Sequence, residues 1–169
     1  MINLIKKYET KLIEHGLCDA DQILIGGLDA EIVWNKTSDA IPMLEKVFEN
    51  LNINSILFAS PKEPFLSILN YIAEKNLDKG EISPNDTETR TFLHTIPITG
   101  QCSHHIIIEK LKERKSLIIA GHGIITFGTV TPEQAFVTFS SVCFSVFVKF
   151  FDDYYFSHKQ NKVNPRQKE

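Results

Sequence analysis

The sequence predicts an α/β protein in which helices cover both faces of one sheet, a three-layer αβα sandwich. Short apolar runs typical of strands alternate along the chain with segments whose apolar residues recur at helical spacing. The chain has 169 residues, 43% of them hydrophobic, which suits a single domain with a sizeable core. The apolar run at residues 116–120, bounded by charge and glycine, is typical of a central strand buried on both faces.

The first third of the chain predicts two helices and two short strands. Residues 2–15 carry apolar side chains at helical spacing, and Gly16 provides a helix stop. Residues 23–25 and 32–34 are short apolar runs that predict strands. A polar segment then leads into a helix at 41–51, which has a proline in its first turn.

The middle of the chain begins with a second strand-and-helix pair. Residues 55–59 predict a buried strand, and residues 65–75 predict a helix with apolar side chains at core spacing. Residues 76–91 form the most polar internal segment, so we expect a long surface loop there. Residues 92–96 then predict a strand.

The last third predicts a helix at 103–113, the strand at 116–120 and a hairpin partner at 124–127. Thr131 and Pro132 form a strong helix start, with an N-cap residue followed by proline.

The helix that follows is apolar almost all round, so it must be covered on two sides. It is either a deep core helix or a helix with one face against another subunit. Residues 135–148 carry no charge, but this run is shorter than the roughly 18–20 residues needed to cross a bilayer. We therefore expect a buried helix and no membrane contact. We expect one domain at residues 1–157 and a polar C-terminal tail at 158–169.

Composition excludes several classes of function. The formal net charge of −3 leaves no broad basic field, which argues against nucleic-acid binding. Cys18, Cys102 and Cys143 are far apart with no CxxC pair, so neither a zinc ribbon nor a disulfide framework is expected. No signal peptide is recognisable at the start of the chain. These features predict a cytoplasmic protein.

The most informative point is His122, which lies between Gly121 and Gly123 directly after the predicted central strand. Glycine permits a tight turn and close approach of a ligand, and a histidine at a strand end can bind a metal ion. The alternative is a turn histidine with no chemical role.

The wider segment at 103–135 resembles the second half of the class II aldolase/adducin family, which includes fuculose-phosphate aldolase. The family pattern there is a helix, a strand, a His-Gly pair, a second strand ending in glycine, and a helix opening with an acid and an alanine. The resemblance implies the family's fold, an αβα sandwich with a mostly antiparallel central sheet. It also implies a zinc ion that acts on a ketose phosphate, with His122 as one metal ligand.

Upstream, the resemblance continues in shape and departs in chemistry. The family's His-x-His metal pair corresponds here to Phe58-Ala59-Ser60, and its catalytic glutamate corresponds to Asp39. Asp39 would therefore be the catalytic acid/base, or simply the N-cap of the next helix. His94 is the best substitute metal ligand, with a structural role as its alternative. The tandem His104-His105 opens a helix, so the two rings should diverge and not share a metal.

These departures leave two hypotheses open. No arginine or Gly-Asn-x-Ser-x-Arg phosphate loop occurs between Ile13 and Asp39. The favoured hypothesis is therefore a non-catalytic binding or assembly module, as the adducin head domain is. The alternative is a metal-dependent aldolase-type lyase or epimerase acting on a small sugar phosphate. Zinc or another divalent metal is expected only if ligands outside the family pattern complete the site. The resemblance also implies a homo-oligomer, typically a tetramer.

Overall fold

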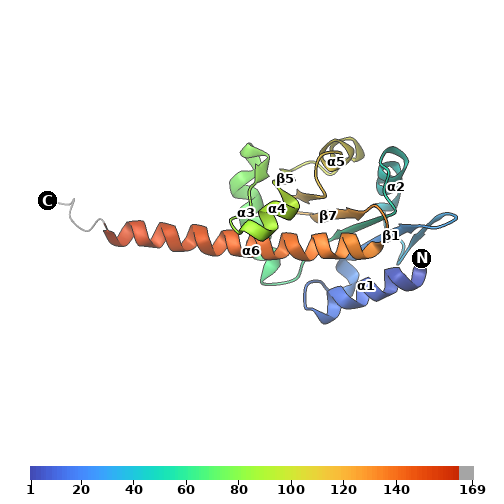
Figure 1. Cartoon of the computed structure of the whole chain (residues 1–169), viewed down its shortest axis with the longest axis horizontal. Helices are drawn as coiled ribbons and strands as arrows, with labels where there is room; N and C mark the ends of the chain where they lie inside the picture. Colours follow the sequence, from blue (N-terminus) through green and yellow to red (C-terminus); the bar gives the residue numbers. More distant parts are fainter. Residues whose placement is uncertain (164–169) are drawn as a thin grey trace.

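A computed structural model describes residues 1–163 as a seven-stranded sheet between two layers of helices (Figure 1). The strand order is β2-β1-β3-β7-β6-β5-β4. Only the β5–β6 pair is parallel, so the prediction of an αβα sandwich with a mostly antiparallel sheet is confirmed. The strands are β1 (Ile23–Leu28), β2 (Ile32–Trp34), β3 (Ser55–Ala59), β4 (Glu81–Ile82), β5 (Ile96–Thr99), β6 (Ser116–Ile119) and β7 (Gly123–Gly128).

The two helix layers follow from the alternation of side chains along each strand. Ile25 and Leu57 point into the core beneath α1, α3 and α6, whereas Leu24 and Ile56 point into the core beneath α2 and α5. All these strand residues are buried, because both faces of the sheet are covered. The helices are α1 (Ile2–Glu14), α2 (Ile41–Asn50), α3 (Phe65–Asn76), α4 (Thr87–Leu93), α5 (His104–Leu111) and α6 (Pro132–Val163), with short 3-10 turns η1 (Ala20–Gln22) and η2 (Leu77–Lys79).

Most predicted elements are present within two or three residues of their expected bounds. The exception is the segment between α3 and α5. Residues 76–91, expected as a long loop, contain η2, β4 and most of α4. The strand expected at 92–96 is also wrong, because its first two residues close α4 and β5 begins only at Ile96.

A side-chain cap accounts for α4. The backbone N–H of Thr89 donates to Asp86 Oδ2 at 2.7 Å, which satisfies one of the free donors at the start of this short helix. Leu93 then packs into the core at 2% exposure, which anchors the helix by its last turn. Because the segment is mostly polar, the sequence analysis recognised neither the Asp86 cap nor the buried Leu93.

α6 is the longest element and runs across the sheet, where it also packs on α1, α3 and α4 (Figure 1). By length and composition the segment Pro132–Lys159 could cross a membrane. Its first half, however, packs on β7 and β3 like the core helix expected from the sequence. α6 continues beyond the expected domain limit at residue 157, so the predicted polar tail begins within the helix. The rest of that tail, residues 164–169, lies outside the described residues.

Candidate functional site

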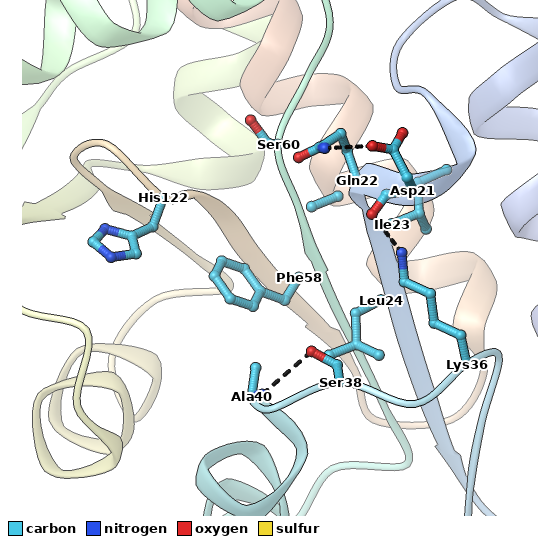
Figure 2. A pocket seen from close by; sticks show the side chains of 11 residues that line it. Asp21, Gln22, Ile23, Leu24, Lys36, Ser38, Ala40, Phe58, Ser60 and His122 are labelled. Carbon is cyan, nitrogen blue, oxygen red and sulfur yellow. Dashed lines mark hydrogen bonds between the residues drawn. The ribbon is translucent and has the colours of Figure 1, made fainter.

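A cavity of about 200 Å³ opens where β3 ends, β1 begins and the β6–β7 hairpin turns (Figure 2). The residues just before α2 line it on the side of the sheet that α2 and α5 cover. His122, the metal ligand predicted from the sequence, lies on its rim. Residues at the end of β3 line the same cavity. Its other lining residues are Asp21, Gln22, Ile23, Leu24, Lys36, Ser38, Ala40, Phe58, Ala59 and Ser60.

The glycines on either side of His122 have separate roles. Gly121 has a φ of 75°, which lets the chain turn sharply between β6 and β7. Gly123 has a φ of 129° and lies so close to β3 that a Cβ atom there would be 2.4 Å from the carbonyl oxygen of Ala59. The missing side chain therefore allows the hairpin to lie against the end of β3. His122 itself is exposed, with Nδ1 3.1 Å from the carbonyl oxygen of Ala120.

The end of β3 supplies an apolar ring and a hydroxyl group to the cavity. Phe58 is half-buried, and its ring projects toward the side of the cavity where His122 lies (Figure 2). Ser60 follows two residues later, with its backbone N–H bonded to the carbonyl oxygen of Gln22 at 3.2 Å. The structure thus brings together His122, Phe58 and Ser60, the three positions that the sequence resemblance pairs with the family's metal histidines.

The opposite wall is polar and was missed by the sequence analysis. Lys36 Nζ donates to the backbone carbonyl oxygens of Ala20 and Asp21, and Gln22 Nε2 donates to Asp21 Oδ2 at 2.8 Å. Nothing in the local sequence marks these residues as a group. They meet because the chain between β2 and α2 returns past the start of β1.

Asn35 holds the segment after β2 against the start of β1. This asparagine is the sequence feature that could have indicated Lys36 as a neighbour of β1. Its Oδ1 accepts a hydrogen bond from the backbone N–H of Ile25 at 2.9 Å, and its Nδ2 donates to the carbonyl oxygen of Ile23 at 3.1 Å. The side chain thereby extends the β1–β2 ladder by one step. An asparagine directly after a strand often bonds to nearby backbone in this way.

Asp39, the expected acid/base, is exposed between two cavity-lining residues, Ser38 and Ala40, and does not itself line the cavity. It does not cap α2 either. Ala40 holds the N-cap position without a side-chain hydrogen bond, and Ser38 Oγ accepts from the Ala40 N–H at 3.2 Å. The structure therefore places Asp39 beside the cavity with its carboxylate in solvent.

The structure does not bring His94 to His122. His94 is the exposed C-cap residue that follows α4 and precedes β5, whereas His122 follows β6. Because β5 and β6 are parallel and pair Ile98 with Ile118, these histidines lie at opposite ends of the two strands. Within one chain, the two cannot bind the same metal ion.

The tandem histidines differ from the sequence expectation. The rings of His104 and His105 were expected to diverge, yet their centroids lie 3.8 Å apart. Desolvation, followed by the charges of His105 and Lys46, lowers the pKa of His104. Both residues begin α5, and neither lines the cavity.

The donor atoms of the cavity do not fit the zinc ion that the resemblance implies. Phe58 has no donor atom, and the neutral hydroxyl of Ser60 is a poor zinc ligand. A catalytic zinc site needs about three protein ligands. Among residues 1–163, less those whose side chains are not described, no group of three or more His, Cys, Asp or Glu could hold a metal ion.

Among the comparisons with known proteins, only the comparison of structures finds a match. No family model and no curated protein sequence matches the chain. Solved structures do match. The l-fuculose-1-phosphate aldolase of Thermus thermophilus superposes with a TM-score of 0.79 at 12% identity, covering 92% of this chain and 96% of that one.

Two further structures agree. YgbL from Escherichia coli gives a TM-score of 0.72 at 10% identity, with 87% of this chain and 86% of that chain covered. A sugar-phosphate aldolase from Thermotoga maritima gives 0.68 at 14% identity, with coverage of 87% and 92%. Identities this low establish the fold, whereas the chemistry of a site has to be argued from its own residues.

Proposed function

Because the chain has the fold of the class II aldolases, we propose that it acts as a non-catalytic binding or assembly module built on that fold. One observation carries the proposal. Phe58 and Ser60 face the cavity beside His122, where the resemblance calls for two more metal-binding imidazoles. A single histidine does not hold zinc at useful affinity, so the metal-dependent cleavage of a carbon–carbon bond has no basis in this cavity.

The alternative is a metal-dependent aldolase-type lyase or epimerase. His122 in an open cavity favours it, as does the fold shared with sugar-phosphate aldolases. In that case Asp39 would be the acid/base and His94 a substitute metal ligand. Since His94 lies at the other end of the sheet from His122, the ligand would have to come from another subunit.

The ligand that suits the cavity best is a small phosphorylated sugar. The Lys36 ammonium group, the His122 imidazole and the hydroxyl groups of Ser38 and Ser60 all line it, and such groups bind phosphate and sugar oxygens. Asp21 also lines the cavity and would favour the sugar hydroxyls over the phosphate.

The proposal also concerns where and with what the protein acts. We expect a homo-oligomer, up to a tetramer, that contacts neither nucleic acid nor membrane. The three cysteines are free thiols, two of them buried, which suits the cytoplasm.

Metal analysis of the purified full chain tests the absence of a zinc site. The chain should carry well under one equivalent of zinc after incubation with excess metal and desalting, with no change on His122→Ala. The matched control is the double variant Phe58→His with Ser60→His, which restores three imidazoles around the cavity and should gain about one equivalent of zinc. Stoichiometric zinc in the natural chain that is lost on His122→Ala would overturn the proposal.

A thermal-shift screen of sugar phosphates tests the binding role. A ligand present at about 100 times its dissociation constant should raise the melting temperature by roughly 5–10 °C. Lys36→Ala should abolish the shift, whereas Lys46→Ala on the outer part of α2 should not. Turnover of any of these sugar phosphates without added metal, or with it, would favour the lyase or epimerase.

A further inference from the structure

The outward face of α6 carries a regular stripe of side chains, four of them exposed and two half-buried. Successive members are spaced by four and three residues, so at 100° per residue they all lie within about 40° of one direction. The four exposed members are Val137, Phe144, Phe151 and Tyr155, with exposures of 43%, 54%, 51% and 59%. The complete stripe is Val137, Ser141, Phe144, Val148, Phe151 and Tyr155.

This stripe is distinct from the face of α6 that packs on the sheet. The inner face buries Phe139, Val142 and Val146 in the main core. The outer stripe follows the alternating four-three spacing of a coiled-coil seam from Val137 to Tyr155, just under three heptads. Large apolar side chains left exposed along one helix face mark an interaction surface.

The first half of the stripe lines a groove between α4 and α6. α4 lies beside α6, and the two helices enclose a cavity of about 490 Å³. Beyond this groove the second half of α6 projects away from the rest of the domain (Figure 1). Phe151 and Tyr155 lie on the projecting half. The groove is lined by Glu88, Thr89 and Phe92 from α4 and by Val137, Ser140, Ser141 and Phe144 from α6.

We propose that the stripe binds the same stripe of a second copy of this chain, with the two α6 helices antiparallel. In one antiparallel register, each residue of one helix lies opposite the residue of the other helix for which the two residue numbers sum to 292. Val137 then lies opposite Tyr155 of the second copy, and Ser141 lies opposite Phe151 of the second copy. Phe144 lies opposite Val148 of the second copy. Each aromatic ring thus meets a smaller side chain, as knobs-into-holes packing requires.

The shape of the chain suits this arrangement. The projecting half of each α6 lies along the anchored half of the other, and Phe151 and Tyr155 of one copy enter the α4–α6 groove of its partner. The two domain bodies sit at opposite ends of the helix pair. At 1.5 Å per residue, the overlap between residues 133 and 159 is about 40 Å long.

Charge at the ends of the stripe favours the same register. Glu133 and Lys159 both lie within about 40° of the stripe direction, and their numbers also sum to 292. Each Glu133 therefore lies at the level of Lys159 of the second copy. A parallel pair would instead place Glu133 beside its own counterpart and Lys159 beside its own counterpart, and these like charges repel.

A lipid surface fits the stripe less well than a second copy. The Lys149–Asp153 ion pair, at 3.5 Å, lies where the projecting half begins, near the middle of α6, and Asp152 lies beside it. Carboxylates at the middle of an inserted helix are strongly disfavoured in a bilayer. Insertion of the whole helix would also strip its inner face from the sheet.

The mass of the full chain in solution is the first test. Light scattering after size-exclusion chromatography should give two chains or a larger even number. Phe151→Asp should raise the dissociation constant at least tenfold with no loss of helical circular dichroism. The matched control is Phe156→Asp, which alters an equally exposed ring (59%) about 100° of arc from Tyr155 and should leave the mass unchanged.

Charge variants test the register without touching the stripe, and a cysteine pair within the stripe tests it by cross-linking. Glu133→Lys alone and Lys159→Glu alone should each weaken the dimer, and the two together should restore it. A chain with Ser141→Cys and Phe151→Cys should cross-link to a dimer under mild oxidation.

Three outcomes would overturn the inference. They are a monomer at concentrations near 100 μM, a chain that co-floats with neutral phosphatidylcholine vesicles as a monomer, or cross-linking of the single variant Ser141→Cys to itself, which would indicate a parallel pair. None of these measurements depends on the cavity, so they test the α6 interface separately from ligand binding. The inference rests on the homo-oligomer expected under the proposed function: a monomer would contradict both, whereas an oligomer unaffected by Phe151→Asp would contradict this interface alone.

Discussion

Two positions around the candidate site show how single residues set its geometry and chemistry. Gly123 allows the β6–β7 hairpin to contact the end of β3, which places His122 near Phe58. Phe58 then decides the chemistry, because an apolar ring fills the place of a metal-binding group. The backbone therefore sets the shape of the cavity, while its side chains decide what it can hold.

Gly123→Ala should destabilise the fold by about 2–4 kcal/mol, since the new Cβ meets the backbone of Ala59 and the φ angle is positive. The measurement is urea unfolding followed by circular dichroism. Gly121→Ala is the control, because its Cβ meets no atom within 4 Å and only the positive φ of 75° is strained, at about 1 kcal/mol. Equal losses for the two variants would contradict the close approach of the hairpin to β3.

Asp86 gives a prediction about pH. Desolvation alone would raise its pKa, but hydrogen bonds from Thr89 outweigh it and lower the pKa below the ordinary value of 3.8. A lowered folded-state pKa stabilises the protein above the unfolded-state pKa, and this stabilisation is lost as the pH falls through the folded-state value.

Asp86→Ala should therefore cost about 1 kcal/mol near neutral pH and progressively less below about pH 4. The free energies of unfolding of both proteins, measured across this range, give the difference directly. Glu88→Ala, also in the first turn of α4, is the control and should show a smaller loss. A difference that stays constant down to pH 2 would contradict the cap.

Among the elements, α6 combines two environments in one continuous helix. Phe139 is fully buried where the helix crosses the sheet, whereas Phe156 is 59% exposed on the projecting half. The sequence pattern alone treats both as members of one apolar helix. Packing against β7, β3 and the neighbouring helices separates them.

This division predicts very different effects of truncating the two rings. Phe139→Ala should lower the free energy of unfolding by about 3–5 kcal/mol through the loss of buried surface and the cavity that remains. Phe156→Ala should change it by less than about 0.5 kcal/mol. Chemical denaturation checks both values. Similar losses at the two positions would mean that the projecting half is also part of the core.

For the whole molecule, the strand order determines which parts open first. β3, β7 and β6 are central and have helices on both faces, whereas β2 and β4 form the two edges of the sheet. Amide hydrogens at the centre of a sheet exchange only through large-scale opening, and those at its edges exchange through local fluctuation.

Hydrogen exchange followed by mass spectrometry should therefore find the strongest protection in β3, β6 and β7. Peptides covering β2 and β4 should exchange at least tenfold faster. Protection of β2 equal to that of β7 would show that another chain covers this edge. The measurement at low protein concentration serves as the control for such an assembly.

The sequence by itself determined the fold class, most helices and strands, and the position of His122, because these depend on local periodicity and on the glycines around one histidine. It failed between α3 and α5, where a capped helix of seven residues carries too little apolar signal. It also gave His94 as a candidate ligand without the information that a parallel strand pair separates it from His122.

Only the tertiary structure decided which residues share the cavity and which apolar residues of α6 are buried. Lys36 and Asp21 line the same cavity as His122 although they are far from it in sequence, and Phe139 and Phe144 differ in exposure although they are five residues apart. The physical reason is that periodicity reports the environment along one segment. The distances between segments follow from the order of strands and the packing of helices on them, and no segment encodes that order alone.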